Sequence, residues 1–141
     1  MAEVSDEGSK LVRTYYEQFL TAPGDLRIAD EILAPDVVFD NPISPDGIHG
    51  LPAYKEFALR WYGGFPDRVF TIDELLEQGD KVAASFTITG THLGVFMGAA
   101  PTGEPIKVRG ANIFRIEDGR IKEVHAFFDP RQLLGPLGLG G

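Results

Sequence analysis

The chain has 141 residues, 43% of them hydrophobic, which is enough to bury the core of one domain. Thirteen basic and 21 acidic residues give a formal net charge of −8 without a basic cluster, so we expect no nucleic-acid partner. The sequence contains no cysteine, which excludes disulfides and Cys-ligated metals. It shows neither a signal peptide nor an apolar run long enough to span a membrane, so we expect a cytoplasmic protein without a membrane partner.

The first half of the chain is predicted to form three helices. Residues 1–8 are polar and are expected to be disordered, so the single domain is expected to cover residues 9–141. Apolar side chains then recur at helical spacing, and turn-forming residues separate the helical stretches. The expected helices are residues 9–20, 25–33 and 51–61, with residues 37–41 as a short strand that leads into a loop before the third helix.

The second half is predicted to form a β-sheet. Four stretches rich in β-branched and aromatic residues are separated by turn formers, and Asp118-Gly119 indicates a tight hairpin because Gly adopts positive φ without steric cost. Helices followed by an antiparallel meander indicate an α+β fold, in which a curved antiparallel β-sheet forms a cone and three helices cover its concave face. The expected strands are residues 68–77, 81–89, 106–116 and 120–128.

Two features suggest an interface. The loop between Thr91 and Glu104 contains Val95, Phe96 and Met97, which are more hydrophobic than an ordinary exposed loop and indicate a lid or a dimer contact. A cone of this kind also leaves its convex face exposed. We therefore expect a homodimer.

Side-chain alternation in the last hairpin places polar groups beside apolar ones. Asn112 lies in an otherwise apolar row of the first strand. On the second strand, strict alternation puts Ile121, Glu123, His125, Phe127 and Asp129 on one face. A polar group on an apolar face costs free energy without a partner, so it is either satisfied in the core or working in a cavity.

Asp129 is the first candidate for chemistry. It follows residues 125–128, His-Ala-Phe-Phe, and precedes Pro130. A carboxyl group among aromatic side chains would have a raised pKa, which suits acid/base catalysis. The structural alternative is that Asp129 caps a short C-terminal helix with Pro130 at its first position.

Two adjoining stretches resemble a known family. Residues 90–110 contain a Gly-Thr-His turn and a Pro-Thr-Gly turn, and residues 112–138 contain a Phe-Asp pair followed by Leu-Leu and Leu-Gly. Both are similar to the C-terminal half of SnoaL-like polyketide cyclases, members of the superfamily of nuclear transport factor 2 and ketosteroid isomerase. The resemblance extends over nearly the whole chain from about Leu11 and implies the cone fold.

The resemblance implies roles for four catalytic candidates. In this family, the position of Asp129 corresponds to a general acid/base, which would abstract an α-proton in an intramolecular aldol-type ring closure of a polyketide ester, without a cofactor. Asn112 resembles in position the protonated Asp of ketosteroid isomerase, and its amide can also donate to a substrate oxyanion. Tyr15 matches the tyrosine of the isomerase's first helix. His92 belongs to the Gly-Thr-His turn and is a candidate for ligand contact, the alternative being an exposed turn histidine.

The other candidates are expected to bind a flat polycyclic or long apolar substrate. Asn41 falls where the isomerase has its catalytic base, and because an amide cannot accept a proton, steroid-type isomerisation is disfavoured. Only one of Tyr15 and Tyr16 is expected to face fully inward. His125 could assist Asp129 or be a core or interface residue. The expected substrate-binding residues are Phe39, Asn41, Tyr54, Trp61, Phe86, Phe114, His125 and Phe127.

Three histidines on separate elements lack metal-ligand spacing, so we expect no metal. Two alternatives to the cyclase remain. The first is another enzyme on this scaffold, such as an epoxide-opening cyclase or hydrolase, a hydroxylase-like relative or a ketosteroid-type isomerase. The second is a non-catalytic, dimeric small-molecule-binding domain. A raised pKa of Asp129 would favour an enzyme, and a normal value with an occluded cavity would favour the binding domain.

Overall fold

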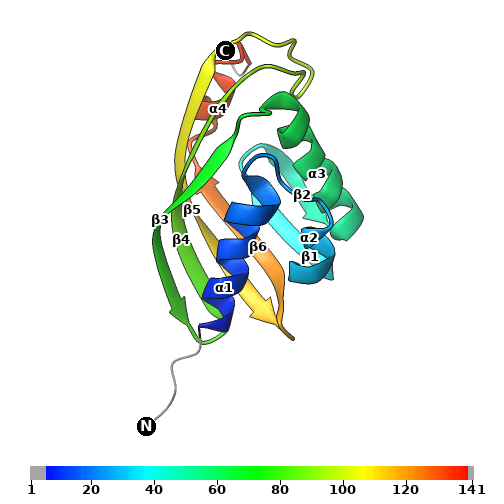
Figure 1. The fold of residues 1–141 in the computed structure, drawn as a ribbon, viewed down its shortest axis with the longest axis vertical. Coiled ribbons are helices and arrows are strands. Elements are labelled where there is room, and N and C mark those ends of the chain that lie inside the picture. The colour runs from blue at the N-terminus through cyan, green and yellow to red at the C-terminus, as the bar shows by residue number, and fades with distance from the viewer. Residues whose placement is uncertain (1–5, 140–141) are drawn as a thin grey trace.

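A curved, open β-sheet carries the helices on one of its faces (Figure 1). The computed structural model describes residues 6–139. Six strands form the sheet in the order β2-β1-β6-β5-β4-β3. The elements in chain order are α1 (Glu7–Thr14), the π-helix η1 (Tyr15–Leu20), α2 (Ile28–Ile32), β1 (Leu33–Asn41), β2 (Ser44–His49), α3 (Leu51–Gly64), β3 (Val69–Gln78), β4 (Lys81–Thr91), β5 (Pro105–Glu117), β6 (Arg120–Phe128) and α4 (Pro130–Leu134).

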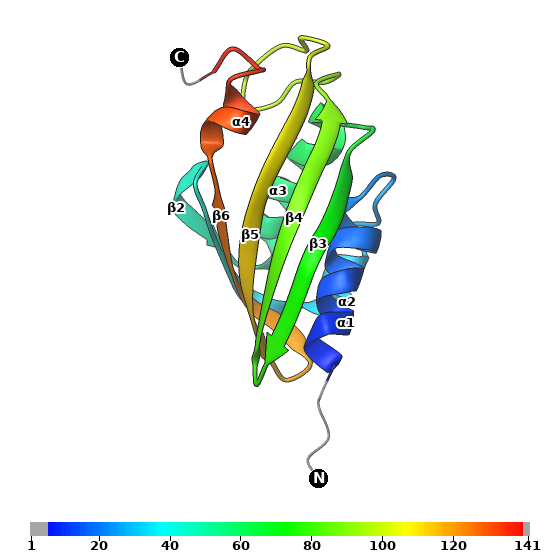
Figure 2. The same ribbon diagram turned by 90° about the vertical axis from the view of Figure 1, so that its left-hand side faces the viewer.

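The predicted α+β meander is confirmed. Strands β3 to β6 pair antiparallel in sequence, and β1 joins the meander by pairing parallel to β6. The turn between β5 and β6 has positive φ at both Asp118 and Gly119, as a tight hairpin requires. Figure 2 looks onto the outer face of the sheet, with α3 behind the strands.

The segment after the first strand differs from the expectation. It was expected to be a loop because turn formers dominate it, but β2 forms there and pairs antiparallel with β1. The connection is short: the side-chain Oδ1 of Asn41 accepts a hydrogen bond from the backbone N–H of Ile43 at 3.1 Å. Strand β1 also begins earlier than expected, at Leu33, directly after α2 ends.

The first helix begins at Glu7, so two of the residues expected to be disordered form its first turn. The free N–H groups of Gly8 and Ser9 donate to the carboxylate of Glu77 on β3, at 3.2 and 2.8 Å. This contact fastens the start of the helix to the sheet. Residues 1–5 of the segment expected to be disordered lie outside the described residues.

The first helix ends in the π-helical segment η1, which places two neighbouring tyrosines in the core. Tyr15 and Tyr16 are 2% and 1% exposed, so the expectation that only one would face fully inward is wrong. The cause is that η1 is enclosed on two sides: Tyr15 packs against Tyr54 of α3, and Tyr16 packs against Phe86 of β4. π-Helical turns interrupt regular helices at functional sites more often than elsewhere.

A buried arginine holds the end of η1 in place. The guanidinium of Arg68 donates to the carbonyl oxygens of Leu20, at 2.5 Å, and of Pro23, at 3.0 Å. It also lies over the ring of Tyr62, with its central carbon 3.9 Å from the ring centre. The turn that follows η1 is thereby fixed to the start of β3.

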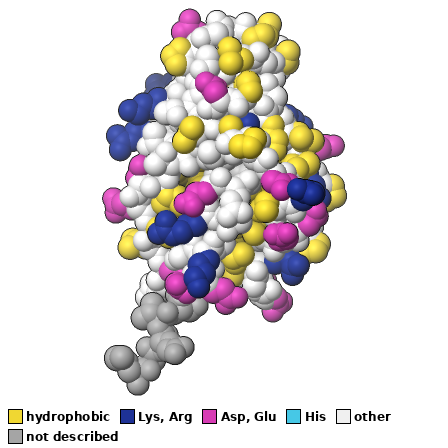
Figure 3. Space-filling view, viewed as in Figure 1, with side chains coloured by type: hydrophobic (Ala, Val, Ile, Leu, Met, Phe, Trp, Pro, Cys, Tyr) yellow, Lys and Arg dark blue, Asp and Glu magenta, His cyan; other side chains and the backbone are white. Residues whose placement is uncertain are grey.

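The loop of residues 92–104 lies at one end of the molecule, near α4 (Figures 1 and 3). Phe96 is buried against Trp61 and Phe65, whereas Val95 and Met97 are exposed. Figure 3 shows apolar side chains on this end of the molecule, while acidic and basic side chains are interspersed farther down the same face. The hydrophobic loop is therefore anchored by one aromatic residue and exposes its other apolar side chains.

Candidate functional site

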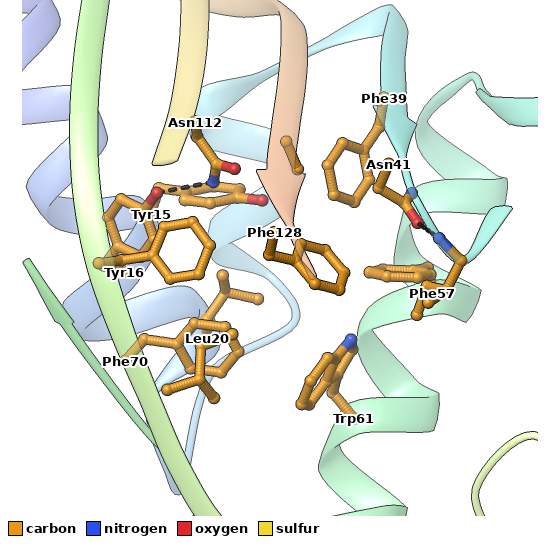
Figure 4. Close-up of a pocket in the computed structure, with 14 residues that line it drawn as sticks. Tyr15, Tyr16, Leu20, Phe39, Asn41, Phe57, Trp61, Phe70, Asn112 and Phe128 are labelled. Carbon is orange, nitrogen blue, oxygen red and sulfur yellow. Dashed lines mark hydrogen bonds between the residues drawn. The ribbon is translucent and has the colours of Figure 1, made fainter. Parts of the chain in front are cut away.

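One apolar pocket lies between the inner face of the sheet, η1, β1 and α3 (Figure 4). None of the 14 residues that line it is charged. The cavity volume is about 40 Å³, which is room for a few water molecules. The lining residues are Tyr15, Tyr16, Leu20, Phe39, Asn41, Ile43, Phe57, Trp61, Phe70, Phe86, Ile88, Asn112, Ala126 and Phe128.

Asn112 forms the polar corner of this pocket together with Tyr16. Asn112 is 5% exposed, and its Nδ2 donates to the hydroxyl of Tyr16 at 2.6 Å. Its Oδ1 is buried and has no hydrogen-bond partner. The neighbours of Asn112 on the adjoining strands are Ala84 and Ala126, whose small side chains leave room around the amide. The inward orientation predicted from strand alternation is confirmed.

A second pair of hydroxyl groups lies beside this corner. The hydroxyls of Tyr15 and Tyr54 are hydrogen-bonded to each other, and Tyr15 is the member that lines the pocket. Burial raises the pKa of Tyr15, Tyr16 and Tyr54 above the ordinary value for a phenol. All three therefore stay protonated at neutral pH and act as uncharged hydrogen-bonding groups.

Asn41 lines the pocket on the side opposite Asn112 (Figure 4). Its Oδ1 accepts from Ile43 N–H, which fixes the orientation of the amide, and its Nδ2 is a buried donor without a partner. Asn41, Ile43 and Phe128 are the lining residues that are only half buried. We place the mouth of the pocket among these three residues.

Six of the twelve predicted site residues line this pocket, and two more support its wall from behind. The ring of Tyr54 stacks on Phe39, with centroids 5.0 Å apart, and the edge of Phe114 contacts Tyr15, with centroids 5.3 Å apart. The six lining residues are Tyr15, Phe39, Asn41, Trp61, Phe86 and Asn112.

Asp129 does not line the pocket. It caps helix α4: its carboxylate accepts from the backbone N–H of Arg131 at 3.0 Å and forms an ion pair with the Arg131 guanidinium at 2.9 Å. The side chain is 40% exposed. Hydrogen bonds from Arg131 hold the pKa of Asp129 below its ordinary value. The expected dry carboxyl group with a raised pKa is therefore wrong, and the predicted helix cap is confirmed.

His125 and Phe127 lie on the outer face of the sheet. Phe127 is 59% exposed, and His125 lies between the carboxylates of Asp40, at 3.1 Å, and Glu123, at 3.2 Å. A β-bulge explains the misplacement, since β6 carries one extra residue between its pairings with Ile116 and Arg115 of β5. An extra residue inverts the alternation of everything after it.

His92 is buried but lies away from the pocket. Its Nδ1 accepts from the backbone N–H of Thr102 at 3.2 Å and is 3.0 Å from the Thr102 hydroxyl, and its ring packs beside Phe65. Its Nε2 is buried without a partner. The structure thus places His92 at the base of the 92–104 loop, neither on this pocket nor in an exposed turn.

Sequence reasoning missed eight lining residues. Half of them could have been found by extending the row of Asn112 across the sheet, because Ala126 is its direct neighbour and Phe70 pairs with Ile88 on the same inner face. Phe57 lies one helical turn before Trp61. The missed residues are Tyr16, Leu20, Ile43, Phe57, Phe70, Ile88, Ala126 and Phe128.

Two other kinds of feature were searched for. Within residues 6–139, no three His, Cys, Asp or Glu side chains are grouped so that they could hold a metal ion. In the same described part of the chain, every helix is too short or too polar to cross a membrane.

Solved structures share this fold. A SnoaL-like polyketide cyclase candidate from Jannaschia sp. CCS1 superposes with a TM-score of 0.86 at 20% identity, covering 100% of this chain and 98% of that one. IdmH, a candidate polyketide cyclase from Streptomyces antibioticus, has a TM-score of 0.75 at 31% identity and covers 93% and 98%. AclR, a candidate hydroxylase from Streptomyces galilaeus, has a TM-score of 0.73 at 24% identity and covers 94% and 78%.

The sequence comparison gives the family. No protein of curated function matches the chain. The family model for the SnoaL-like polyketide cyclases matches residues 10–135, nearly the whole of the region that forms the sheet, the helices and the pocket. The chain therefore belongs to the SnoaL-like polyketide cyclase family.

Proposed function

We propose that this protein binds an apolar, polyketide-like molecule and promotes its intramolecular aldol-type ring closure. The supporting observation is a pocket with aromatic walls whose polar groups, Tyr15, Tyr16, Asn41 and Asn112, are all uncharged. Family membership and the likeness to IdmH support a cyclase over the other activities found on this scaffold.

The proposed reaction needs no external reagent. The carbon between two carbonyl groups loses one proton and forms a bond to another carbonyl carbon of the same chain. The oxygen of that carbonyl becomes an alkoxide, which gains one proton. The product is an isomer of the substrate. A pocket that holds both carbons in contact supplies most of the acceleration through proximity. Asn41 Nδ2, a donor without a partner, can polarise the carbonyl that is attacked.

We assign no proton transfer to Asp129 in this proposal. Its carboxylate is ionised, paired with Arg131 and absent from the pocket lining. A carbon acid flanked by carbonyls is acidic enough to exchange its proton with solvent, so the pocket must mainly orient the reacting carbons and stabilise the oxygens. This differs from the role that the family resemblance implies for Asp129, and the two roles predict opposite results for the same variant.

The pocket must widen to admit such a substrate. Its volume of about 40 Å³ is far below that of an ordinary ligand pocket, about 300 Å³ or more. The half-buried residues Asn41, Ile43 and Phe128 are the ones that can move without opening the core. This narrowness is also the observation that favours the second candidate function, a non-catalytic binding domain for a smaller apolar ligand.

The test is ring closure of synthetic linear β-keto esters that carry a further ketone. NMR follows the product, and mass spectrometry shows that its mass equals that of the substrate. We expect Tyr16→Phe and Asn112→Leu to lower the rate by about tenfold or more, since each removes a hydrogen bond to a substrate oxygen. Asp129→Asn should stay within about twofold of wild type, whereas loss of a general base would cost about 100-fold or more. Tight binding of the esters without any turnover would instead support the binding domain.

We also propose a homodimer formed through the outer face of the sheet. Leu76, Ala83 and Ile113 are direct neighbours across three strands there, and Leu76 is 70% exposed. Light scattering should give twice the mass of the chain, and Ile113→Glu should halve it. Leu59→Glu, at an exposed leucine of α3, is the matched control and should leave the mass unchanged. A monomeric wild type contradicts this proposal.

A further inference from the structure

The polar corner of the pocket holds one donor, the Tyr16 hydroxyl, and one acceptor, Asn112 Oδ1, on opposite sides of the Asn112 amide. The hydroxyl of Tyr16 accepts from Asn112 Nδ2, so its own proton remains available for a ligand oxygen. The Oδ1 of Asn112 belongs to the same amide, is buried and has no partner. In Figure 4 this oxygen lies on the side of the amide away from Tyr16, toward the pocket.

An unpartnered buried acceptor is uncommon, because nearly all buried polar atoms of native proteins are hydrogen-bonded. Asn112 is only 5% exposed and its Oδ1 is buried, so bulk water does not reach this oxygen. No donor among the described residues that line the pocket is hydrogen-bonded to Asn112 Oδ1. A ligand group that carries a proton would complete the site.

We infer that the Tyr16–Asn112 corner selects a neutral hydroxyl group, an enol or an alcohol, whose O–H donates to Asn112 Oδ1. This inference rests on the proposed function in one respect, that the pocket is the substrate site. For a β-dicarbonyl chain it means that the substrate binds as its enol tautomer, in which the nucleophilic carbon is already prepared for ring closure.

Three other ligand groups fit this corner less well. A ketone or an ether has no proton for Asn112 Oδ1 and would leave it unpaired. A carboxylate would bring its charge against that oxygen, into a pocket whose lining has no cation. Tyr16 is a neutral phenol, so it offers a carboxylate a hydrogen bond and no positive charge.

The test compares four probes with one apolar body: 4-methylphenol, 4-methylanisole, toluene and 4-methylbenzoate. They are titrated into the ¹⁵N-labelled full-length protein at pH 7, and NMR gives each Kd and the shift of the Asn112 side-chain amide. We expect 4-methylphenol to bind about tenfold more tightly than 4-methylanisole or toluene, as one neutral hydrogen bond allows. At saturation it should shift the Asn112 amide signals further than 4-methylanisole does, and 4-methylbenzoate should bind most weakly.

Two variants locate the preference. Asn112→Leu should bind 4-methylphenol and 4-methylanisole with the same affinity, whereas Ser85→Ala, on the outer face of the neighbouring strand β4, should keep the wild-type preference. Equal affinities for the phenol and the ether in wild type, or tightest binding of the benzoate, overturn the inference without reference to any variant. If the preference survives in Asn112→Leu, the inference is equally overturned.

These outcomes are separable from those of the ring-closure assay. A phenol preference that depends on Asn112, with no turnover of any β-keto ester, leaves the inference standing and removes the proposed function. Turnover without any phenol preference removes the inference alone.

Discussion

The wall of the pocket and the end of β6 carry the two sets of polar groups from which catalysis could be argued, and they are opposite in character. At the wall, Tyr16 and Asn112 are buried and uncharged. At the strand end, Asp129 and Arg131 are exposed and charged. The carboxylate is the stronger base by type, yet hydrogen bonds from Arg131 lower its pKa and so make it a weaker base.

This contrast teaches that surroundings, more than residue type, decide what a group can do. Burial raises the pKa of Tyr16, and hydrogen bonds from Arg131 lower the pKa of Asp129. The two regions therefore affect stability at opposite ends of the pH scale. Isosteric exchanges of amide and carboxyl group at the two places test that difference directly.

The largest expected effect is that of Asn112→Asp. A carboxyl group at this buried position would have a folded-state pKa above its unfolded value of about 3.9, because burial disfavours the charged form. The free energy of unfolding of the variant is then highest below the unfolded pKa and falls as pH rises through the folded pKa. We expect a free energy of unfolding about 2–4 kcal/mol lower than wild type at pH 7, measured by urea denaturation.

The same variant at pH 4 is the internal control. There the carboxyl group is neutral in the folded state and about half protonated in the unfolded chain, so the difference from wild type should shrink to about 1 kcal/mol. A difference of the same size at both pH values would mean that the corner is open to water and that the contrast between the two regions is smaller than the structure indicates.

Sequence reasoning succeeded where a feature depends on neighbouring residues and failed where it depends on residues far apart in the chain. The Asp118-Gly119 hairpin and the inward row of Asn112 were predictable because turn chemistry and alternation are local. The face of Phe127 was not, because the bulge that inverts it is set by pairing with β5. Strand β2 was missed because its turn formers serve a hairpin with β1, which only the partner strand reveals.

The part of the candidate site that could be predicted is the part formed by the inward-facing row of side chains that contains Asn112. Asn112 and Phe86 follow from alternation, whereas the joint burial of Tyr15 and Tyr16 depends on the widened turn of η1. No periodicity in the sequence signals a π-helical segment, since it arises from packing on two sides. The exposure of Asp129 depends on Arg131, two residues later, and that ion pair was not considered in the prediction.

A smaller effect is expected at alkaline pH, from the buried phenols. The folded-state pKa of Tyr54 is raised by burial, so above pH 10 the unfolded chain releases its proton more readily and stability falls as pH rises. Tyr54→Phe should cost about 1 kcal/mol at pH 7, because Tyr15 loses its partner. Above pH 10 the free energy of unfolding of the variant should fall less steeply than that of wild type. The two slopes should differ by about 1.4 kcal/mol per pH unit.

Guanidinium denaturation at pH 9, 10 and 11 measures both slopes. Lysine titration contributes equally to wild type and variant, so the difference between the slopes isolates Tyr54. Parallel curves would contradict the enclosed position of the tyrosine pair and would make the pocket wall resemble the strand end.

The smallest effect is expected at the strand end itself. Asp129→Asn keeps a good helix cap and loses only an exposed ion pair, so its urea midpoint at pH 7 should match that of wild type within error. The pKa of Asp129 is lowered in the folded state, so its contribution is present above about pH 4 and is lost as pH falls further. Arg131→Met should therefore raise the pKa of Asp129 toward its ordinary value, as measured by ¹³C NMR titration. If the wild-type carboxyl group already titrates above that value, Asp129 is shielded from water after all, and the acid/base role that the family resemblance implies for it would replace the uncharged pocket as the source of catalysis.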